Sequence, residues 1–216
     1  MKFKNRDEAA LILAEKLQDY KDTNAVILAI PRGGVPMGFI IAKSLDLPLE
    51  IVLSKKIGHP DSKEYAIGAV TLHNRVLSDA AKNISKTYIE SETEKIRENL
   101  RERHHKFCGS KAEMDLKGKI LIVVDDGIAT GNTILSTIEM LHEQGPERII
   151  VAIPVSPPSA LKNLKSSPYI DELICLYTPA NFNAVGQFYE DFSEVNDEQV
   201  KHLLETANSD RLKQKQ

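Results

Sequence analysis

Three continuous apolar runs constrain the fold of this chain more than any other feature. They occupy 25–30 (AVILAI), 119–124 (KILIVV) and 148–155 (RIIVAIPV). Each run has the length of a strand and shows no alternation of apolar and polar residues, as expected of strands buried on both faces. Apolar residues recur at helical spacing over 35–45 and 134–145, after the first and the second run. Strands that alternate with helices predict a parallel sheet built from right-handed crossovers.

The remaining periodic segments extend the same plan. Helices are predicted over 7–19, 158–165 and 196–206, and further strands over 49–54 and 172–177. We therefore expect the α/β class, with a central, mainly parallel sheet flanked by helices. Because domains commonly have about 150 residues, we expect residues 1–216 to form a single domain.

One stretch interrupts the alternation. Residues 66–77 predict a hairpin of two short strands around a turn at Asn74, and 79–107 predict a long, highly charged helix. We read 66–107 as an insertion. The segment 55–64 just before it carries Gly, Pro and several charges, which predicts a mobile loop.

Composition narrows the class of protein. The 28 basic and 31 acidic residues leave a net charge of -3, so no global charge attracts nucleic acid or an anionic membrane. Cys108 and Cys175 are too far apart in sequence for a CxxC metal pair and too few for a disulfide framework. There is no apolar leader segment and no apolar run of membrane-spanning length. A cytoplasmic protein without nucleic-acid or membrane partners is expected.

The chemistry concentrates in the segment 122–133 (IVVDDGIATGNT). A buried strand delivers Asp125 and Asp126 to its C-terminal end, where open α/β sheets bind ligands. A turn rich in Gly and Thr follows, and the next helix begins there, so free N–H groups and the Thr130 and Thr133 hydroxyls form a cradle for an anion. Two carboxylates alone would repel a phosphate, so we expect them to bind sugar hydroxyls or a divalent ion that is bound to the ligand.

The segment VVDDGIATGNT is similar to the phosphoribosyl-pyrophosphate signature of type I phosphoribosyltransferases. More narrowly, the chain resembles a group of uncharacterised, predicted phosphoribosyltransferases of bacteria and archaea. Their shared features are present as IPRGGVPMG, SKKIGHPDSKEYAIGAV and FNAVGQFYEDF. One departure from the general signature is Gly127, which stands where an aliphatic residue is usual.

The resemblance implies a role for each residue of the signature. Asp125 and Asp126 would hold the ribose hydroxyls and face Mg²⁺, the implied cofactor, and both would be catalytic. The phosphate of the donor would be bound by the turn and helix start, which comprise Ala129, Thr130, Gly131, Asn132 and Thr133.

Two further segments match ligand loops of the family. Arg32, Gly33 and Gly34 match the short loop that contacts pyrophosphate, and Arg32 also suits bidentate phosphate contact. Lys55 and Lys56 match the start of the flexible loop that closes over the donor and excludes water. Arg32 and Lys55 would stabilise the departing pyrophosphate, and the sequence does not decide which lysine reaches the ligand.

Six of the twelve aromatic residues fall within 169–192, in the C-terminal part of the chain. They could form a pocket for a planar base, for which Tyr177 and Phe182 are the candidates, or a satellite core or interface. The chain has an aromatic-rich C-terminal segment at about 177–206. Its 182–192 stretch and the long helix over 79–107 have no evident burial partner, so a homodimer is expected.

The resemblance implies a Mg²⁺-dependent transfer of the phosphoribosyl group from 5-phosphoribosyl-1-pyrophosphate to a nitrogenous acceptor base, with release of pyrophosphate. Two alternatives stay open: a regulator that senses the donor without turnover, and a hydrolase or phosphorylase of a phosphorylated sugar. Ala129 stands where enzymes for 6-oxopurines usually have Asp, which predicts little turnover of hypoxanthine or guanine.

Overall fold

The computed structural model describes residues 2–109, 111 and 113–214, without the side chains of 208 and 210–214. A five-stranded sheet with the order β2-β1-β6-β7-β8 forms its centre, and all neighbouring strands are parallel. The strands are β1 (Ala25–Ala29), β2 (Leu49–Ile51), β6 (Ile120–Val124), β7 (Arg148–Val155) and β8 (Glu172–Tyr177). The predicted parallel α/β sheet is therefore confirmed.

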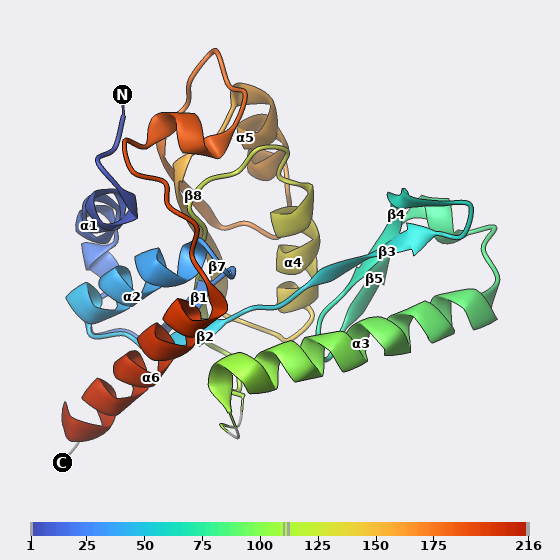
Figure 1. The fold of residues 1–216 in the computed structure, drawn as a ribbon, viewed down its shortest axis with the longest axis horizontal. Coiled ribbons are helices and arrows are strands. Elements are labelled where there is room, and N and C mark those ends of the chain that lie inside the picture. The colour runs from blue at the N-terminus through green and yellow to red at the C-terminus, as the bar shows by residue number, and fades with distance from the viewer. Residues whose placement is uncertain (1, 110, 112, 215–216) are drawn as a thin grey trace.

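Helices cover both faces of this sheet, which explains why the inner strands β1 and β6 are apolar throughout (Figure 1). One face packs against α1 (Arg6–Lys16), α2 (Gly34–Leu45) and α6 (Asp197–Gln214), and the other against α4 (Asn132–His142) and α5 (Pro158–Lys165). In β6, for example, Ile122 and Val124 belong to the first core, and Leu121 and Val123 belong to the second. The two cores anchor the strand that precedes the carboxylate pair.

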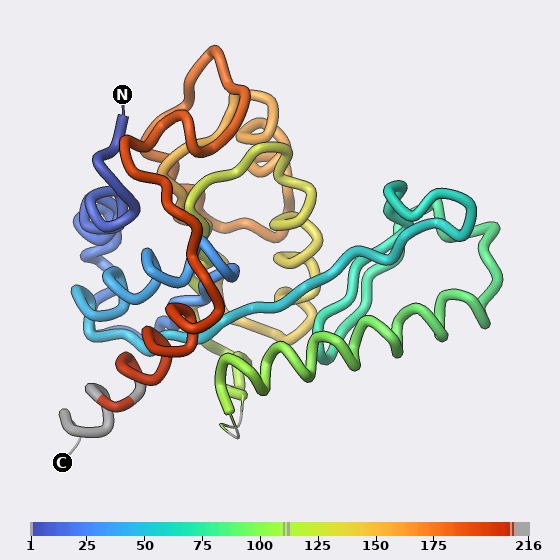
Figure 2. Tube along the Cα trace, in the orientation of Figure 1, coloured from blue at the N-terminus to red at the C-terminus, as the bar shows by residue number. Residues whose placement is uncertain are grey.

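A second, antiparallel sheet projects from the core together with the long helix (Figures 1 and 2). It comprises β3 (Lys55–His59), β4 (Ser62–Val70) and β5 (Arg75–Leu77), and α3 (Lys86–Cys108) packs along it. The predicted hairpin over 66–77 and the predicted helix are confirmed. The helix begins at 86 rather than 79. The Ser85 hydroxyl caps its start by accepting a hydrogen bond from the Tyr88 N–H at 3.2 Å.

The prediction of a loop over 55–64 is wrong, because β3 and the start of β4 occupy most of it. Ile57 is completely buried, and the Tyr88 hydroxyl donates to the Gly58 carbonyl oxygen at 2.8 Å. These contacts with α3 come from outside the segment and outweigh its turn-forming composition. The second sheet and α3 together occupy 55–108, and we call this segment the inserted unit; that it is an insertion, predicted at 66–107, stays a prediction.

The start of the chain pairs with the segment that follows β8. The Phe3 N–H donates to the Phe188 carbonyl oxygen and the Glu190 N–H donates to the Phe3 carbonyl oxygen, both at 2.8 Å. The segment after β8 thus returns to the start of α1 before α6 begins at its cap, Asn196. Among the described residues, we find no helix with the length and apolar character to cross a membrane.

Candidate active site

The site forms where β1 and β6 end side by side, since Ala29 pairs with Val124. The loop after β1 therefore lies against the carboxylates that follow β6. A Cβ atom on Gly33 would lie 1.9 Å from Asp126 Oδ2, and a Cβ on Gly34 would lie 2.6 Å from the Val124 carbonyl oxygen. The atoms nearest to a Cβ on Gly34 belong to the backbone, so no larger residue fits there, whereas a side chain at Gly33 would displace the Asp126 carboxylate. The Pro31–Arg32 peptide bond in the same loop is cis.

A cavity of about 190 Å³ opens at the start of α4, and we call it the aspartate cavity. Gly131 adopts a φ of 80° there and turns the chain into the helix. The first N–H groups of α4 have no acceptor within the helix and are free to bind an anion. The residues that line the cavity are Ile30, Asp125, Gly127, Ile128, Ala129, Thr130, Gly131, Thr133 and Ile134. The predicted phosphate cradle and one predicted carboxylate thus share one cavity.

The two aspartates have different surroundings. Asp125 lines the aspartate cavity, and its only hydrogen-bond partner among the described residues is the Asp126 N–H, at 2.9 Å. Burial raises the pKa of Asp125 well above its usual value, and the neighbouring Asp126 carboxylate raises it further. Burial also raises the pKa of Asp126, while the adjacent Arg6 guanidinium opposes that rise. Asp126 does not line the cavity.

Arg6 is the residue that sequence reasoning missed. Its Nε and Nη2 atoms lie 2.9 and 2.8 Å from Asp126 Oδ2. Its Nη1 atom donates to the Ser193 carbonyl oxygen at 2.8 Å. The guanidinium also lies 3.9 Å from the centre of the Phe192 ring. The Tyr189 hydroxyl donates to the Asp126 carbonyl oxygen at 2.6 Å. The start of the chain and the segment between β8 and α6 thus hold Asp126, and nothing in the local sequence around Arg6 or Asp126 signals their pairing.

Replacing Arg6 by Met is expected to lower the free energy of unfolding by about 3 kcal/mol, because Asp126 keeps a mostly buried charge without its partner. Arg101 provides a matched control on the surface, since it and Glu94 are more than half exposed. Arg101→Met is expected to cost less than about 1 kcal/mol. Urea unfolding of both variants measures the difference, and equal losses would contradict a structural role for the Arg6 pair.

The predicted lysines do not reach the aspartate cavity. Lys55 and Lys56 are exposed on β3. Lys56 lines a separate cavity of about 360 Å³ between the second sheet and α4, which also contains Asn132 and Ser136. Asn132 therefore faces the inserted unit rather than the Asp125 carboxylate. A contact of either lysine with the donor stays a prediction.

Arg32 points toward a third region. Its guanidinium lies 2.5 Å from Glu194 Oε1 and 3.7 Å from Asp197 Oδ1, and it lines a groove beside α3. Ile30 lines the aspartate cavity and Pro31 lines this groove, so the two spaces flank one short segment of chain. The structure thus brings the Arg32 loop next to the cavity without placing its guanidinium inside.

The aromatic candidates form a cluster of their own. Tyr177 and Phe182 pack on the buried Phe188, with ring centres 5.8 and 5.3 Å apart, and neither lines the aspartate cavity. Their segment nevertheless passes close to the site, since a Cβ on Gly127 would lie 2.6 Å from a methyl group of Val185. Gly127, with a φ of 153°, permits this approach, which accounts for its departure from the usual aliphatic residue. The packing favours a satellite core, and the base pocket stays a prediction.

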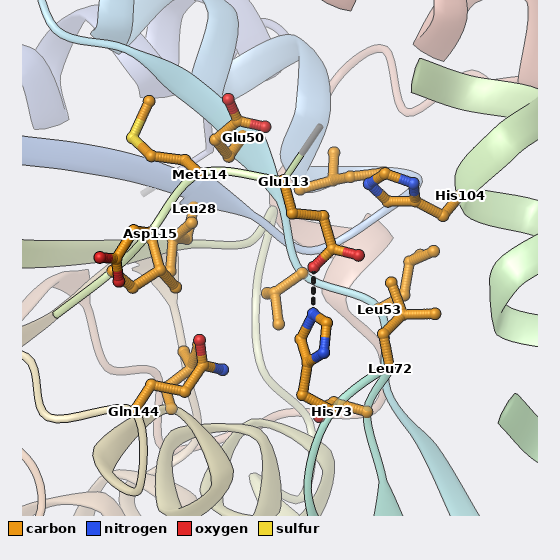
Figure 3. Close-up of a pocket in the computed structure, with 15 residues that line it drawn as sticks. Leu28, Glu50, Leu53, Leu72, His73, His104, Glu113, Met114, Asp115 and Gln144 are labelled. Carbon is orange, nitrogen blue, oxygen red and sulfur yellow. Dashed lines mark hydrogen bonds and ion pairs between the residues drawn. The ribbon is translucent and has the colours of Figure 1, made fainter. Parts of the chain in front are cut away.

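Another cavity, of about 320 Å³ and thus larger than the aspartate cavity, lies between β2, the base of the second sheet and the end of α4 (Figure 3). Its lining includes the carboxylates of Glu50, Glu113 and Asp115, and His73 Nε2 lies 2.6 Å from Glu113 Oε2. Lys111 pairs with Glu50, but no Lys or Arg side chain among the described residues lines this cavity, so its three carboxylates disfavour a phosphate group. We therefore assign the phosphate-binding role to the smaller aspartate cavity.

The residues present fit a magnesium ion that is shared with a ligand. Mg²⁺ prefers carboxylate oxygens and keeps several waters, and it commonly binds through one or two carboxylates plus substrate phosphates. Asp125 offers such an oxygen beside the phosphate cradle. Among the described residues, no group of three or more His, Cys, Asp or Glu side chains could hold a metal. Substrate oxygens would have to complete the site.

Comparisons with known proteins identify the family of the chain. The family model "Phosphoribosyl transferase domain" matches residues 4–192. A protein of Mycobacterium tuberculosis named "Putative phosphoribosyl transferase Rv0571c" is 34% identical over 212 residues, which cover 96% of this chain and 47% of that protein. "Transcriptional regulator GfcR" of Methanocella arvoryzae is 23% identical over 144 residues, or 65% of this chain and 51% of that protein. The chain therefore spans about half the length of these curated relatives.

One solved structure is similar over almost the whole chain. TT1426 from Thermus thermophilus is 36% identical, with a TM-score of 0.85, and the match covers 94% of this chain and 98% of that one. The inserted unit is therefore included in the similarity rather than left outside it. The AQ2163 protein of Aquifex aeolicus, at 13% identity and a TM-score of 0.50, shares the fold alone.

Proposed function

The chain belongs to the phosphoribosyl transferase domain family, and we propose from this premise that it transfers a phosphoribosyl group from 5-phosphoribosyl-1-pyrophosphate to a nitrogenous acceptor. The observation that carries the proposal is the aspartate cavity, where Asp125 and the start of α4 face one space. A sugar phosphate satisfies both parts of that cavity, since its phosphate needs N–H donors and its hydroxyl groups need acceptors.

Each part of the donor has a partner under this proposal. The 5′-phosphate accepts N–H groups of 130–133 and the hydroxyls of Thr130 and Thr133. The ribose hydroxyls donate to Asp125, whose carboxylate has no other side-chain partner among the described residues. Asp126 acts from outside the cavity, because Arg6 holds its carboxylate and fixes the backbone that carries Asp125.

The chemical step needs no covalent nucleophile. The acceptor nitrogen forms a bond to C1 of the ribose as the bond from C1 to the diphosphate oxygen breaks, and that bonding pair leaves with pyrophosphate. Asp125 stabilises the positive charge that develops on the sugar, and Arg32 stabilises the departing anion. Bound Mg²⁺ would supply charge neutralisation on the diphosphate.

A regulator is the second candidate, because one relative of the chain is named as a transcriptional regulator. Phosphorus NMR of the full chain with donor, Mg²⁺ and a panel of nitrogenous bases separates the functions. Transfer releases pyrophosphate only when an acceptor is present. Release without any acceptor would indicate a hydrolase, and an intact donor with every acceptor would favour the regulator.

The acceptor carries a further prediction. Ala129 lines the aspartate cavity and has no titratable group, so it cannot exchange a proton with the N7 of a 6-oxopurine. We expect hypoxanthine and guanine to be turned over at least about a hundredfold more slowly than the preferred base, because general acid–base catalysis typically contributes 10²–10⁴-fold. The same base panel measures this ratio. Hypoxanthine or guanine as the fastest acceptor would overturn the argument from Ala129.

A further inference from the structure

A groove of about 550 Å³ opens between the loop after β1, the C-terminal half of α3 and the start of α6. Three cationic side chains line it: Arg32 from the loop, and Arg103 and Lys106 from α3. Two acidic side chains, Glu102 and Asp197, also line it. The inserted unit thus contributes positive charge to the space next to the aspartate cavity.

The cations of the groove are only partly neutralised. Lys106 Nζ lies 2.7 Å from Asp197 Oδ2, and Arg32 reaches Asp197 only at 3.7 Å. Arg103 lies 5.4 Å from the centre of the Phe107 ring and makes no ion pair among the described residues. The closest partner of Arg32 is Glu194, at 2.5 Å, and the Glu194 side chain is 77% exposed. The exposed Glu194 carboxylate therefore pairs with the Arg32 guanidinium, the group that an anionic ligand in the groove would contact.

The resemblance already assigns the contact with pyrophosphate to the Arg32 loop. We propose that Arg103 and Lys106 of the inserted unit bind the diphosphate of the donor beside that loop, and that Glu194 occupies Arg32 until the diphosphate displaces it. The inference rests on the proposed function. A donor with its 5′-phosphate at the start of α4 has its diphosphate on the far side of the ribose, and the groove begins one residue beyond the cavity lining.

Electrostatics favours the exchange at Arg32. A diphosphate carries more negative charge than a carboxylate and offers several oxygens for bidentate contact with Arg. Displacing Glu194 costs little, because a carboxylate at an exposed position regains its hydration and exposed ion pairs contribute little. Arg103 and Lys106 then contact oxygens that Arg32 leaves free.

Calorimetry tests the proposal. It measures the affinity of the full chain for inorganic pyrophosphate at low ionic strength, with and without Mg²⁺. Arg103→Gln and Lys106→Gln are each expected to weaken binding about tenfold, the effect of losing one charge-assisted hydrogen bond. Arg101→Gln is the control on the same helix, since Arg101 pairs with Glu94 and does not line the groove. It should change binding less than about twofold.

Glu194→Gln is expected to increase the affinity for pyrophosphate, and a variant that is merely misfolded would not show such an increase. Because Gln cannot hold Arg32 by charge, this variant is expected to bind pyrophosphate about threefold more tightly than the unaltered chain. Weaker binding by Glu194→Gln, or Arg103→Gln and Lys106→Gln no different from Arg101→Gln, would overturn the proposal.

The anion that binds in the groove could belong to the donor or to a phosphorylated acceptor, and two ligands distinguish these cases. Pyrophosphate should compete with 5-phosphoribosyl-1-pyrophosphate, whereas ribose 5-phosphate, which lacks the diphosphate, should bind Arg103→Gln and the unaltered chain equally. If pyrophosphate and the donor bind together, the groove serves another ligand and the proposal is wrong. A chain that shows the expected pyrophosphate pattern but no transfer would instead overturn only the proposed function.

Discussion

Asp125→Asn is expected to weaken binding of the donor with Mg²⁺ about a hundredfold, while the protein keeps its fold. The substitution preserves the shape of the side chain but removes the charge that faces the aspartate cavity. Loss of a hydrogen bond to a charged acceptor costs about 1.5–3 kcal/mol, and the contact with a metal-bound ligand adds to it. Calorimetry with the donor, with circular dichroism to check the fold, measures the effect.

The stability of the same variant provides an independent check. Burial raises the pKa of Asp125, so its charged form is disfavoured in the folded protein and Asn should be tolerated or stabilising. Asp126→Asn removes the partner of the mostly buried Arg6 and should lower the free energy of unfolding. An unchanged donor affinity in Asp125→Asn would remove the role assigned to this residue.

Gly34→Ala is expected to lower the free energy of unfolding by about 2–3 kcal/mol and to weaken donor binding. Its new Cβ atom would lie 2.6 Å from the Val124 carbonyl oxygen and 3.2 Å from Asp125 Cα. Because both contacts are backbone atoms, relief requires β6 and the start of α2 to separate, a cost typical of overpacking. The separation would also move Asp125 away from the phosphate cradle.

Gly131→Ala is the matched comparison. A Cβ there meets nothing closer than 3.7 Å, so the variant is affected only by its φ of 80°. The expected loss is about 1 kcal/mol, the usual cost of a left-handed residue that is not Gly. Thermal and urea unfolding compare the two variants, and a smaller loss for Gly34→Ala would contradict the close packing of the two segments.

The central sheet and the position of the carboxylates after β6 could be predicted because their signals are local. Each buried strand is a continuous apolar run, and the residues after the strand in β6 are adjacent in sequence to the helix that begins the phosphate cradle. The resemblance implied one ligand for the Arg32 loop and Asp125, and the parallel strands bring both to the same edge of the sheet. Gly33 and Gly34 then fit because the two segments touch.

The contacts that sequence reasoning missed join residues far apart in the chain. Arg6 and Asp126 are 120 positions apart, and Arg32 and Glu194 are 162 apart, so no spacing rule connects them. The strand β3 was missed for a related reason. Its composition is typical of a loop, but Ile57 is buried and α3 holds Gly58 through Tyr88. Tertiary contacts decided both cases.

Hydrogen–deuterium exchange of the full chain, with and without 5-phosphoribosyl-1-pyrophosphate and Mg²⁺, tests most directly where the donor binds. The account predicts protection of peptides that cover 125–135 and 31–34, because the ligand covers the aspartate cavity and the adjoining loop. Peptides that cover 50–53 and 113–116, around the larger cavity, should exchange as before. Protection at the larger cavity without protection of 125–135 would contradict the assignment of the donor site.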